Sequence, residues 1–274
     1  MAKKATANLP VSYDEELARQ AEAYKSNEAA SASGQFISFK GGVITYRGAQ
    51  IEGNKLDVII LHSIFENAYY AQDFDPNSPQ APDCYAYGNT QEELKPHELA
   101  KHREGDDNGL CAACWANGWG SDPKGGRGKA CRNTRRLAVL SAPSNLDVNH
   151  IQKSEVAFIK LPVTSVPTYS SHVMQIADIL KKPPFGVITR LSTVPDQKSQ
   201  FKVQFELIQE IKDKEMLMAL MDRQKAAKSA IMFPYPDIEE QQPRRNAPQQ
   251  RRPANRGAAP ARGRNNQTQS RRKY

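Results

Sequence analysis

Long hydrophobic runs are missing from this 274-residue sequence, in which 39% of the residues are hydrophobic. The longest unbroken apolar stretch, Met216–Met221, has six residues, whereas a membrane-spanning helix needs about 20. The opening residues, Met1–Lys4, lead into polar sequence without the apolar segment of a secretory signal. We therefore expect neither a membrane partner nor secretion, and we place the protein in the cytoplasm.

Cysteine is also scarce, with four residues in the whole chain. In a chain without a secretory signal the thiols are expected to stay reduced, and metal ligation is then commoner than disulfide formation. The cysteine content therefore favours a metal site over a disulfide framework.

Acidic residues are absent from the last 34 positions of the chain. The same stretch holds ten basic residues: Arg244, Arg245, Arg251, Arg252, Arg256, Arg262, Arg264, Arg271, Arg272 and Lys273. The whole chain has 38 Lys+Arg and 30 Asp+Glu, so the net charge of +8 comes from this tail and the rest is close to neutral. A composition rich in Arg, Pro, Gln and Asn buries no core, and we expect residues 241–274 to be disordered. Such a tail is typical of contact with nucleic acid or with an acidic replication or transcription protein.

The remainder divides into an N-terminal segment, residues 1–33, and one large domain, residues 34–240. The N-terminal segment predicts a short helix over residues 12–25 and then a linker. The domain predicts strands at 35–40, 43–46, 55–63, 136–141, 155–161, 185–191 and 201–208. Two helices are predicted in it, at 171–181 and 213–230, the second with Leu217, Leu220 and Met221 on its apolar side.

Short strands joined by tight turns, such as a two-residue turn at Gly41-Gly42, favour an antiparallel sheet or a small barrel. Phe36, Phe39, Phe201 and Phe205 are expected in its core. Residues 72–134 differ from the rest, because they are rich in Pro, Gly, Asp and Asn and show little apolar periodicity. A loop of that length needs something other than an apolar core to order it.

All four cysteines lie in this segment. Cys111 and Cys114 form a C-x2-C pair, in which two thiolates approach one tetrahedral ion from a tight turn. Cys84 and Cys131 lie on either side of the pair. We therefore predict a structural zinc ion on the four cysteines, which supplies the folding energy that the missing core does not. The spacing leaves two alternatives open: three cysteines with His97 or His102, and no metal.

A basic, aromatic stretch follows the C-x2-C pair. Between Trp115 and Arg136 there are six basic residues and one acid, Asp122, and the stretch holds both tryptophans of the chain. Glycine-rich backbone approaches a phosphate chain closely, Lys and Arg neutralise it, and exposed rings stack on bases. The candidate nucleic-acid contacts are Tyr69, Tyr70, Tyr85, Tyr87, Trp119, Lys124, Arg127, Lys129, Arg132, Arg135 and Arg136. Tyr69 and Tyr70 are expected on opposite faces of a strand, and core packing remains the competing interpretation for each aromatic, above all for Trp115.

Three features together resemble the single-stranded DNA-binding proteins of tailed phages. They are the opening GQFISFKGGVITYRG, the four-cysteine insertion, and GKACRNTRRLAVL running straight into a strand. The resemblance covers residues 34–235. It implies a β-rich α+β fold: an OB-like antiparallel barrel with a zinc-binding insertion at about 72–134 and short flanking helices. It also implies cooperative coating of single strands in phage DNA replication, recombination or repair, in the cytoplasm of the host cell. The basic tail departs from the acidic tail with which many proteins of this functional class end.

The leading hypothesis is therefore a non-enzymatic, sequence-tolerant single-stranded DNA-binding protein with a structural zinc ion. The alternative is an RNA-binding or transcription-associated zinc protein, since Arg-Gly steps in the tail suit RNA. A recruiting protein whose tail binds an acidic partner is a third hypothesis. An enzyme is the least favoured: the sequence has no HExxH motif, and its carboxylates form no recognisable catalytic pattern.

Overall fold

The computed structural model describes residues 36–72, 80–101, 109–197 and 199–235, together with positions 13, 16, 17, 19 and 20. All of these belong to the first of two compact units, Met1–Pro236. The second unit, Asp237–Tyr274, lies outside the described residues. The prediction that residues 241–274 are disordered concerns this unit and therefore also falls outside the described residues. The described N-terminal positions are helical, as expected for the segment 12–25.

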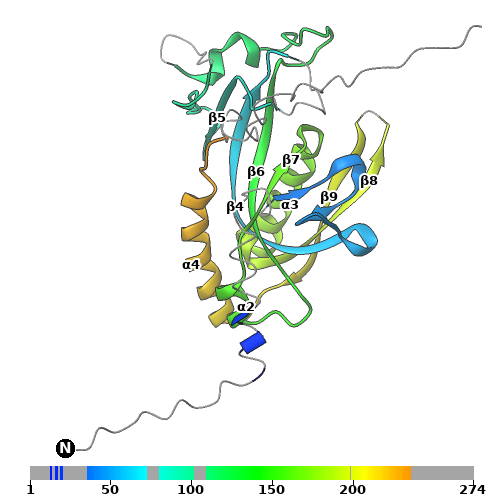
Figure 1. Ribbon diagram of the computed structural model, residues 1–274, viewed down its shortest axis with the longest axis vertical. Helices are drawn as coiled ribbons and strands as arrows, with labels where there is room; N and C mark the ends of the chain where they lie inside the picture. Colours follow the sequence, from blue (N-terminus) through cyan, green and yellow to red (C-terminus); the bar gives the residue numbers. More distant parts are fainter. Residues whose placement is uncertain are drawn as a thin grey trace, which may run out of the picture. The chain divides into compact units, whose positions relative to one another are not determined.

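Nine strands form a single sheet (Figure 1). They are β1 (Phe36–Ser38), β2 (Thr45–Tyr46), β3 (Ala49–Gln50), β4 (Lys55–Tyr69), β5 (Cys84–Gly88), β6 (Cys131–Ser141), β7 (Ala157–Leu161), β8 (Val187–Asp196) and β9 (Gln200–Glu210). Three helices pack on it: α2 (Val148–Lys153), α3 (Val166–Leu180) and α4 (Lys214–Ala230). The β-rich α+β class predicted from the sequence is confirmed.

The sheet is mixed and curls into a half-barrel. Its order is β3-β2-β1-β7-β6-β4-β8-β9, with β5 paired to β4 beside this path. The pair β1–β7 is parallel, with Phe36 opposite Phe158, and the other strand pairs of the described residues are antiparallel. The prediction of a wholly antiparallel barrel is therefore wrong. β1 and β7 are separated by more than 100 residues in the sequence. No local sequence pattern predicts whether such distant strands pair in parallel or antiparallel orientation.

One asparagine holds the two ends of the curl together. Asn54 accepts a hydrogen bond from the backbone N–H of Ile44, at 2.7 Å, and donates one to the carbonyl oxygen of Gly42, at 2.8 Å. It also donates to the hydroxyl of Thr193 on β8. The turn that precedes β2 is thereby tied to the opposite side of the sheet.

A β-bulge in β4 divides its side chains between two cores. Ile60 pairs with Val139 but His62 pairs with Ala138, so Leu61 is an extra residue that changes which alternate positions face outward. The inner core, inside the curl, includes Val58 and Ile60 and is covered by α3. The outer core includes Ile59, Leu61 and Ile64 and is covered by α2 and α4. β4 and β6 continue beyond these cores as a long ribbon toward the cysteine-rich segment (Figure 1). We call this ribbon, with β5, the arm.

Several local predictions need correction. Gly41 and Gly42 do not form a two-residue turn, because a 3-10 turn at Lys40–Gly42 lengthens the connection between β1 and β2. Met221 is 50% exposed rather than part of the apolar side of α4. The segment 72–134 is not an irregular loop throughout, since it contains β5 and the start of β6. The four phenylalanines predicted in the core do pack on the inner or outer cluster.

Candidate metal centre and nucleic-acid interface

The strand register brings two cysteines to the end of the arm. Tyr69, the last residue of β4, pairs with Cys84 on β5 and with Cys131 on β6. These cysteines begin their strands on either side of β4. Cys111 and Cys114 reach the same place from the C-x2-C turn, and all four line one cavity of about 20 Å³.

The C-x2-C turn is held by backbone hydrogen bonds. The N–H of Cys111 donates to the carbonyl oxygen of Leu94, at 2.9 Å, and the N–H of Cys114 donates to the carbonyl oxygen of Cys111, at 3.3 Å. The amide Nδ2 of Asn117 also donates to the carbonyl oxygen of Cys111, at 2.9 Å. The position of both thiols is therefore set by neighbouring elements.

Two of the four thiols, those of Cys111 and Cys131, are harder to ionise than an ordinary cysteine. Burial, and after it the neighbouring Cys84 and Cys114, raise the pKa of Cys111 to about 11. Burial and the other three cysteines raise the pKa of Cys131 to about 12. Clustered thiolates repel one another in a buried site, and a bound cation is what normally offsets that repulsion.

The described residues hold no group of three or more His, Cys, Asp or Glu side chains that meets the geometry of a metal site. No disulfide joins the four cysteines, all of which are described. Their chemistry nevertheless fits zinc, which prefers a closed shell of thiolates in structural sites. A second observation agrees with this fit: Asn67, 3% exposed, lines the same cavity, and its buried Nδ2 has no hydrogen-bond partner within the described residues.

Of the two histidines considered as alternative metal ligands, only His97 lies within the described residues. His97 stacks on Tyr85, with ring centroids 5.0 Å apart, and its Nδ1 accepts a hydrogen bond from the backbone N–H of Leu99. It is not among the residues that line the cysteine cavity. His102 lies outside the described residues. The placement of His97 therefore favours the four cysteines over a set that includes it.

The basic loop that follows the C-x2-C turn is closed by its own hydrogen bonds. The N–H of Gly120 donates to the carbonyl oxygen of Gly128, at 2.8 Å. The hydroxyl of Ser121 donates to the carbonyl oxygen of Ala116, at 3.0 Å, and accepts from the N–H of Ala130, at 3.0 Å. A Cβ atom at Gly128 would lie 2.9 Å from Oδ2 of Asp122, so any other residue there would force the Asp122 side chain to shift.

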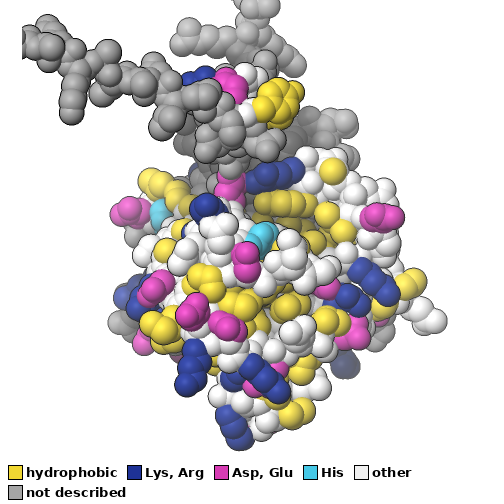
Figure 2. Space-filling view, turned by 90° about the horizontal axis from the view of Figure 1, so that it is seen from below, with side chains coloured by type: hydrophobic (Ala, Val, Ile, Leu, Met, Phe, Trp, Pro, Cys, Tyr) yellow, Lys and Arg dark blue, Asp and Glu magenta, His cyan; other side chains and the backbone are white. Residues whose placement is uncertain are grey.

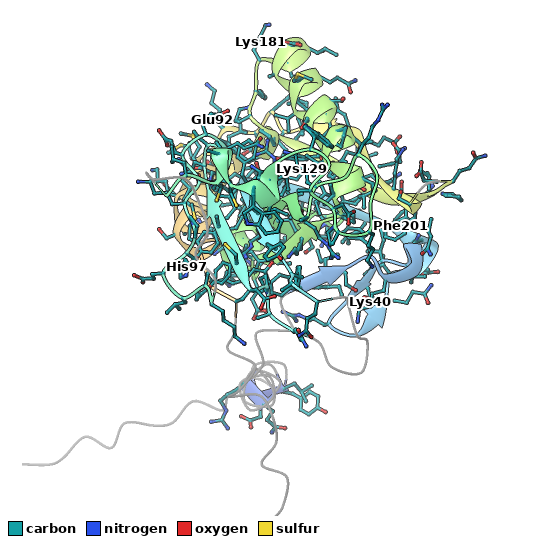
Figure 3. The ribbon with its side chains drawn as sticks, turned by 90° about the horizontal axis from the view of Figure 1, so that it is seen from above. Lys40, Glu92, His97, Lys129, Lys181 and Phe201 are labelled. Carbon is teal, nitrogen blue, oxygen red and sulfur yellow. The ribbon has the colours of Figure 1, made fainter. Side chains whose placement is uncertain are left out.

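Both tryptophans of this loop are exposed. Trp119 is 80% exposed, and Nζ of Lys129 lies 4.9 Å from the centroid of its ring. Trp115 is 55% exposed and meets Tyr69 edge to face, with centroids 5.5 Å apart. Core packing is therefore not the role of either ring. Figure 3 looks onto this end of the molecule, with Lys129 labelled.

The other basic residues of the loop are at the surface too. Lys124 and Arg127 are exposed, and Lys129 is half-buried because its ammonium group also donates to Oδ1 of Asn117, at 3.1 Å. Lys124, Arg127 and Lys129, with the two tryptophans, form what we call the cationic aromatic loop.

The remaining candidates lie on the two faces of the arm. Tyr69 belongs to the face of the cysteines, whereas Tyr70 packs against Arg132, with the guanidinium carbon 5.1 Å from the ring centroid. The expected placement of the two tyrosines on opposite faces is thus observed. Arg135 packs over the ring of Phe65, and burial lowers the pKa of its guanidinium.

Two of the remaining candidates, Arg136 and Tyr85, are buried within the fold. Arg136 is 3% exposed and pairs with Glu66. Tyr85 is buried, and Tyr87 stacks beside it, with ring centroids 6.2 Å apart. We therefore leave Arg136 and Tyr85 out of the surface that contacts a ligand. The residues that sequence reasoning missed here, Asn67 and Glu66, are single polar positions in an apolar strand and carry no motif that would have found them.

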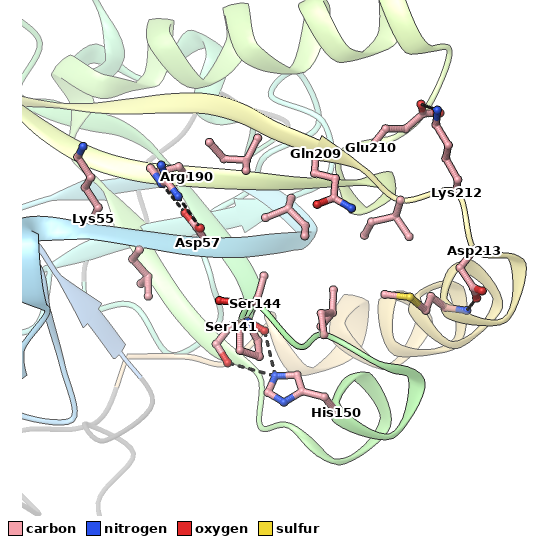
Figure 4. Close-up of a pocket in the computed structure, with 18 residues that line it drawn as sticks. Lys55, Asp57, Ser141, Ser144, His150, Arg190, Gln209, Glu210, Lys212 and Asp213 are labelled. Carbon is pink, nitrogen blue, oxygen red and sulfur yellow. Dashed lines mark hydrogen bonds and ion pairs between the residues drawn. The ribbon is translucent and has the colours of Figure 1, made fainter.

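A groove lies elsewhere, between the starts of β4 and β8, the ends of β6 and β9, and helices α2 and α4 (Figure 4). It has a volume of about 1310 Å³. Its carboxylates have partners: Asp57 pairs with Arg190, at 2.7 Å, Glu210 pairs with Lys182, at 2.9 Å, and Asp213 caps α4. Figure 2, which views the molecule from below, shows Lys and Arg side chains interspersed with Asp and Glu side chains over the described surface.

No helix of the described residues has the length and apolar character to cross a membrane. Comparisons of this chain with protein-family models, with curated proteins and with solved structures find no match.

Proposed function

We propose that this protein is a non-enzymatic, sequence-tolerant single-stranded DNA-binding protein. In this proposal the curled sheet is an OB-like half-barrel, and a structural zinc ion on Cys84, Cys111, Cys114 and Cys131 orders the cationic aromatic loop. The resemblance noted in the sequence suggests service to phage DNA replication, recombination or repair.

The observation that carries the proposal is the pairing of exposed rings with cations on one loop. Trp119 is 80% exposed, and the ammonium group of Lys129 lies 4.9 Å from the centroid of its ring, so an aromatic ring and a cation are presented together at the surface. This arrangement suits a single strand, whose bases stack on aromatic rings while Lys and Arg neutralise its phosphates. Stacking tolerates any base, because every base has a π face, so this loop favours binding without sequence preference.

Duplex DNA suits the loop less well. In a duplex the bases are stacked on one another, so Trp115 and Trp119 would have no free base face to contact. The cations alone would then supply a weaker, salt-sensitive attraction to either form of DNA. The proposal therefore predicts a preference for single strands that depends on the rings.

The zinc ion would act at a distance from the DNA. The four cysteines come from β5, β6 and the C-x2-C turn, so a metal ion that joins them would fix the base of the loop to the arm. The metal supplies folding energy there, and the chain's own residues contact the strand. A catalytic zinc ion would instead need an open position and a general base beside it.

The carboxylates give little support to an enzyme. In the groove between β4, β8, β9 and helices α2 and α4, Asp57 and Glu210 are held by ion pairs, and Asp213 accepts the N–H of Met216 at the start of α4. Groups committed to such partners are poorly placed to bind the two metal ions of a nuclease.

The test is an anisotropy titration of labelled single-stranded DNA, duplex DNA and single-stranded RNA at two salt concentrations. It uses the full chain and a truncation to residues 1–240. We expect single-stranded DNA to bind most tightly, and the preference to survive truncation. Loss of the tail should weaken binding and flatten the salt dependence, which amounts to about −0.7 per phosphate neutralised.

A matched pair of double variants locates the site. Lys124→Ala with Arg127→Ala removes two cations from the loop, and Lys153→Ala with Lys214→Ala removes two exposed cations from the ends of α2 and α4. Only the first pair should lower affinity and salt slope. Tighter binding to RNA would favour the RNA-binding alternative. Binding that vanishes in 1–240 would leave a cationic tail on a recruiting protein and would overturn the proposal.

A further inference from the structure

Asn67 has one end of its amide fixed and the other end free of any hydrogen bond. It lies on β4 opposite Asn133 of β6, whose Nδ2 donates to Oδ1 of Asn67 at 2.6 Å. This bond sets the orientation of the Asn67 amide. Its Nδ2 group is buried and has no hydrogen-bond partner within the described residues.

The free Nδ2 group belongs to the residue that borders the four cysteines. Asn67 lines the cavity between Cys84, Cys111, Cys114 and Cys131. A buried N–H group without an acceptor is costly, and native proteins rarely keep one without a reason. A neutral thiol is a weak acceptor, whereas a thiolate carries the charge that an N–H donor stabilises.

An anionic sulfur in the cavity would supply the acceptor that this donor lacks. Metal ligation keeps a cysteine ionised at neutral pH. Donors outside the ligand shell orient the ligands, and removing such a donor typically weakens metal affinity about 10–100-fold.

We propose that Asn67 is a positioning residue of the metal centre. Its Nδ2–H group donates to one of the cysteine sulfurs that line the cavity when that sulfur ligates the metal, and Asn133 holds the amide in the required orientation. The inference rests on the proposed zinc site and adds to it a specific donor outside the ligand shell.

The first test needs no substitution. The full chain is loaded with ¹¹³Cd²⁺, which replaces zinc on thiolates and is visible by NMR. A hydrogen bond from Asn67 to a ligating sulfur transmits a scalar coupling from cadmium to the Asn67 side-chain amide protons. We expect that coupling for Asn67. A well-resolved Asn67 amide without it overturns the inference.

The second test uses Asn67→Leu, which keeps the size of the side chain and removes the donor. We expect about 10- to 100-fold weaker Cd²⁺ and Zn²⁺ binding in chelator competition. We also expect a shifted sulfur-to-cobalt charge-transfer band in the Co²⁺-loaded protein. Asn133→Ala, which frees the Asn67 amide to rotate, should move both readouts in the same direction by less. Asn149→Leu, at an exposed position of α2, is the matched control and should change neither.

The outcomes separate this inference from the proposed site. If the unsubstituted chain gives no four-thiolate charge-transfer band with Co²⁺, the zinc proposal fails and this inference with it. If the band is present and Asn67→Leu keeps the same band and an affinity within twofold, only the role of Asn67 is overturned.

Discussion

Arg136 on β6 and Glu66 on β4 form an ion pair that is shielded from solvent. Nε of Arg136 lies 2.6 Å from Oε2 of Glu66, and the side chains are 3% and 0% exposed. Lys160 approaches the other carboxylate oxygen from β7, at 2.9 Å, and the hydroxyl of Tyr235 donates to it. Arg136 also donates to the carbonyl oxygen of Phe233, at 2.7 Å. The pair therefore attaches the segment that follows α4 to the middle of the sheet.

Glu66→Gln should destabilise the protein strongly. It leaves Arg136 buried without a countercharge, and removing one partner of a buried ion pair typically costs about 3–5 kcal/mol. Urea unfolding of the metal-loaded full chain should show a loss of that size in the free energy of unfolding. Glu92→Gln, at an exposed position, should change it by less than about 0.5 kcal/mol. Equal stability of the two variants would mean that the pair contributes nothing.

The same carboxylate predicts how stability depends on acid. Burial alone would raise the pKa of Glu66, but Lys160, Arg136 and the Tyr235 hydrogen bond outweigh it, so the pKa falls below its ordinary value of 4.5. A carboxyl whose pKa is lower in the folded state stabilises the protein above the unfolded pKa and loses that contribution as the pH falls through the folded value.

The difference in unfolding free energy between the unsubstituted chain and Glu66→Gln should therefore be constant above about pH 5 and shrink below pH 4.5. Urea titrations at pH 7, 5, 4 and 3 measure it. Release of the proposed zinc ion at low pH would affect both proteins and largely cancel in the difference. A difference that stays constant down to pH 3 would contradict the lowered pKa.

Hydrophobic periodicity and capping were enough to predict most elements of the fold. α4 begins after Asp213, whose carboxylate accepts the N–H of Met216, and β4 starts where expected at Lys55, although it continues to Tyr69 rather than ending at Ser63. The parallel pairing of β1 with β7 was out of reach, because the strands meet through tertiary packing of Phe36 and Phe158 rather than through a local turn.

The sequence predicted the clustering of the cysteines in the candidate site but not the strand that carries its basic residues. The clustering of the cysteines in one segment is visible in the sequence, and the structure brings them to one cavity. The sequence predicts that this strand begins at Arg136, with Arg132 and Arg135 before it, but β6 already begins at Cys131. The alternation of a strand then sends Arg135 and Arg136 to opposite faces, which only the strand boundary reveals.

Substitution of Asn54 should also lower the free energy of unfolding substantially. Its side chain joins the turn before β2 to Thr193 on β8, and its own backbone has φ 54°. Asn54→Ala removes the hydrogen bonds and places a Cβ-bearing residue without a compensating side chain in the left-handed region. We expect a loss of about 2–4 kcal/mol. Asn54→Gly tolerates that φ and should lose roughly 1 kcal/mol less than Asn54→Ala. Thermal and urea unfolding of both variants checks the order, and the reverse order would contradict this account.

Cys114→Ser should loosen the end of the arm while leaving both cores folded. The inner and outer clusters do not include Cys114, so the loss of a metal ligand should act locally. We expect faster amide hydrogen exchange over the described residues from 84 to 131, little change in β8 and β9, and weaker binding of single-stranded DNA. Removing the metal from the unsubstituted chain with a chelator should give the same exchange pattern. Full DNA affinity together with an unchanged melting temperature would exclude a structural metal.

Trp119→Ala should weaken DNA binding without weakening the fold. Trp119 is 80% exposed, so truncation removes little buried area, whereas a base stacked on its ring would lose about 1–3 kcal/mol. The affinity for single-stranded DNA, measured by anisotropy, should fall about 5- to 150-fold. Trp119→Phe keeps a ring face and should retain most of the affinity. Met218→Ala removes a side chain that is 67% exposed on α4 and should have no effect. If Trp119→Ala binds like the unsubstituted chain at both salt concentrations, the strand does not pass over this ring. The cations of the loop would then act alone, and a preference for single strands would need another origin.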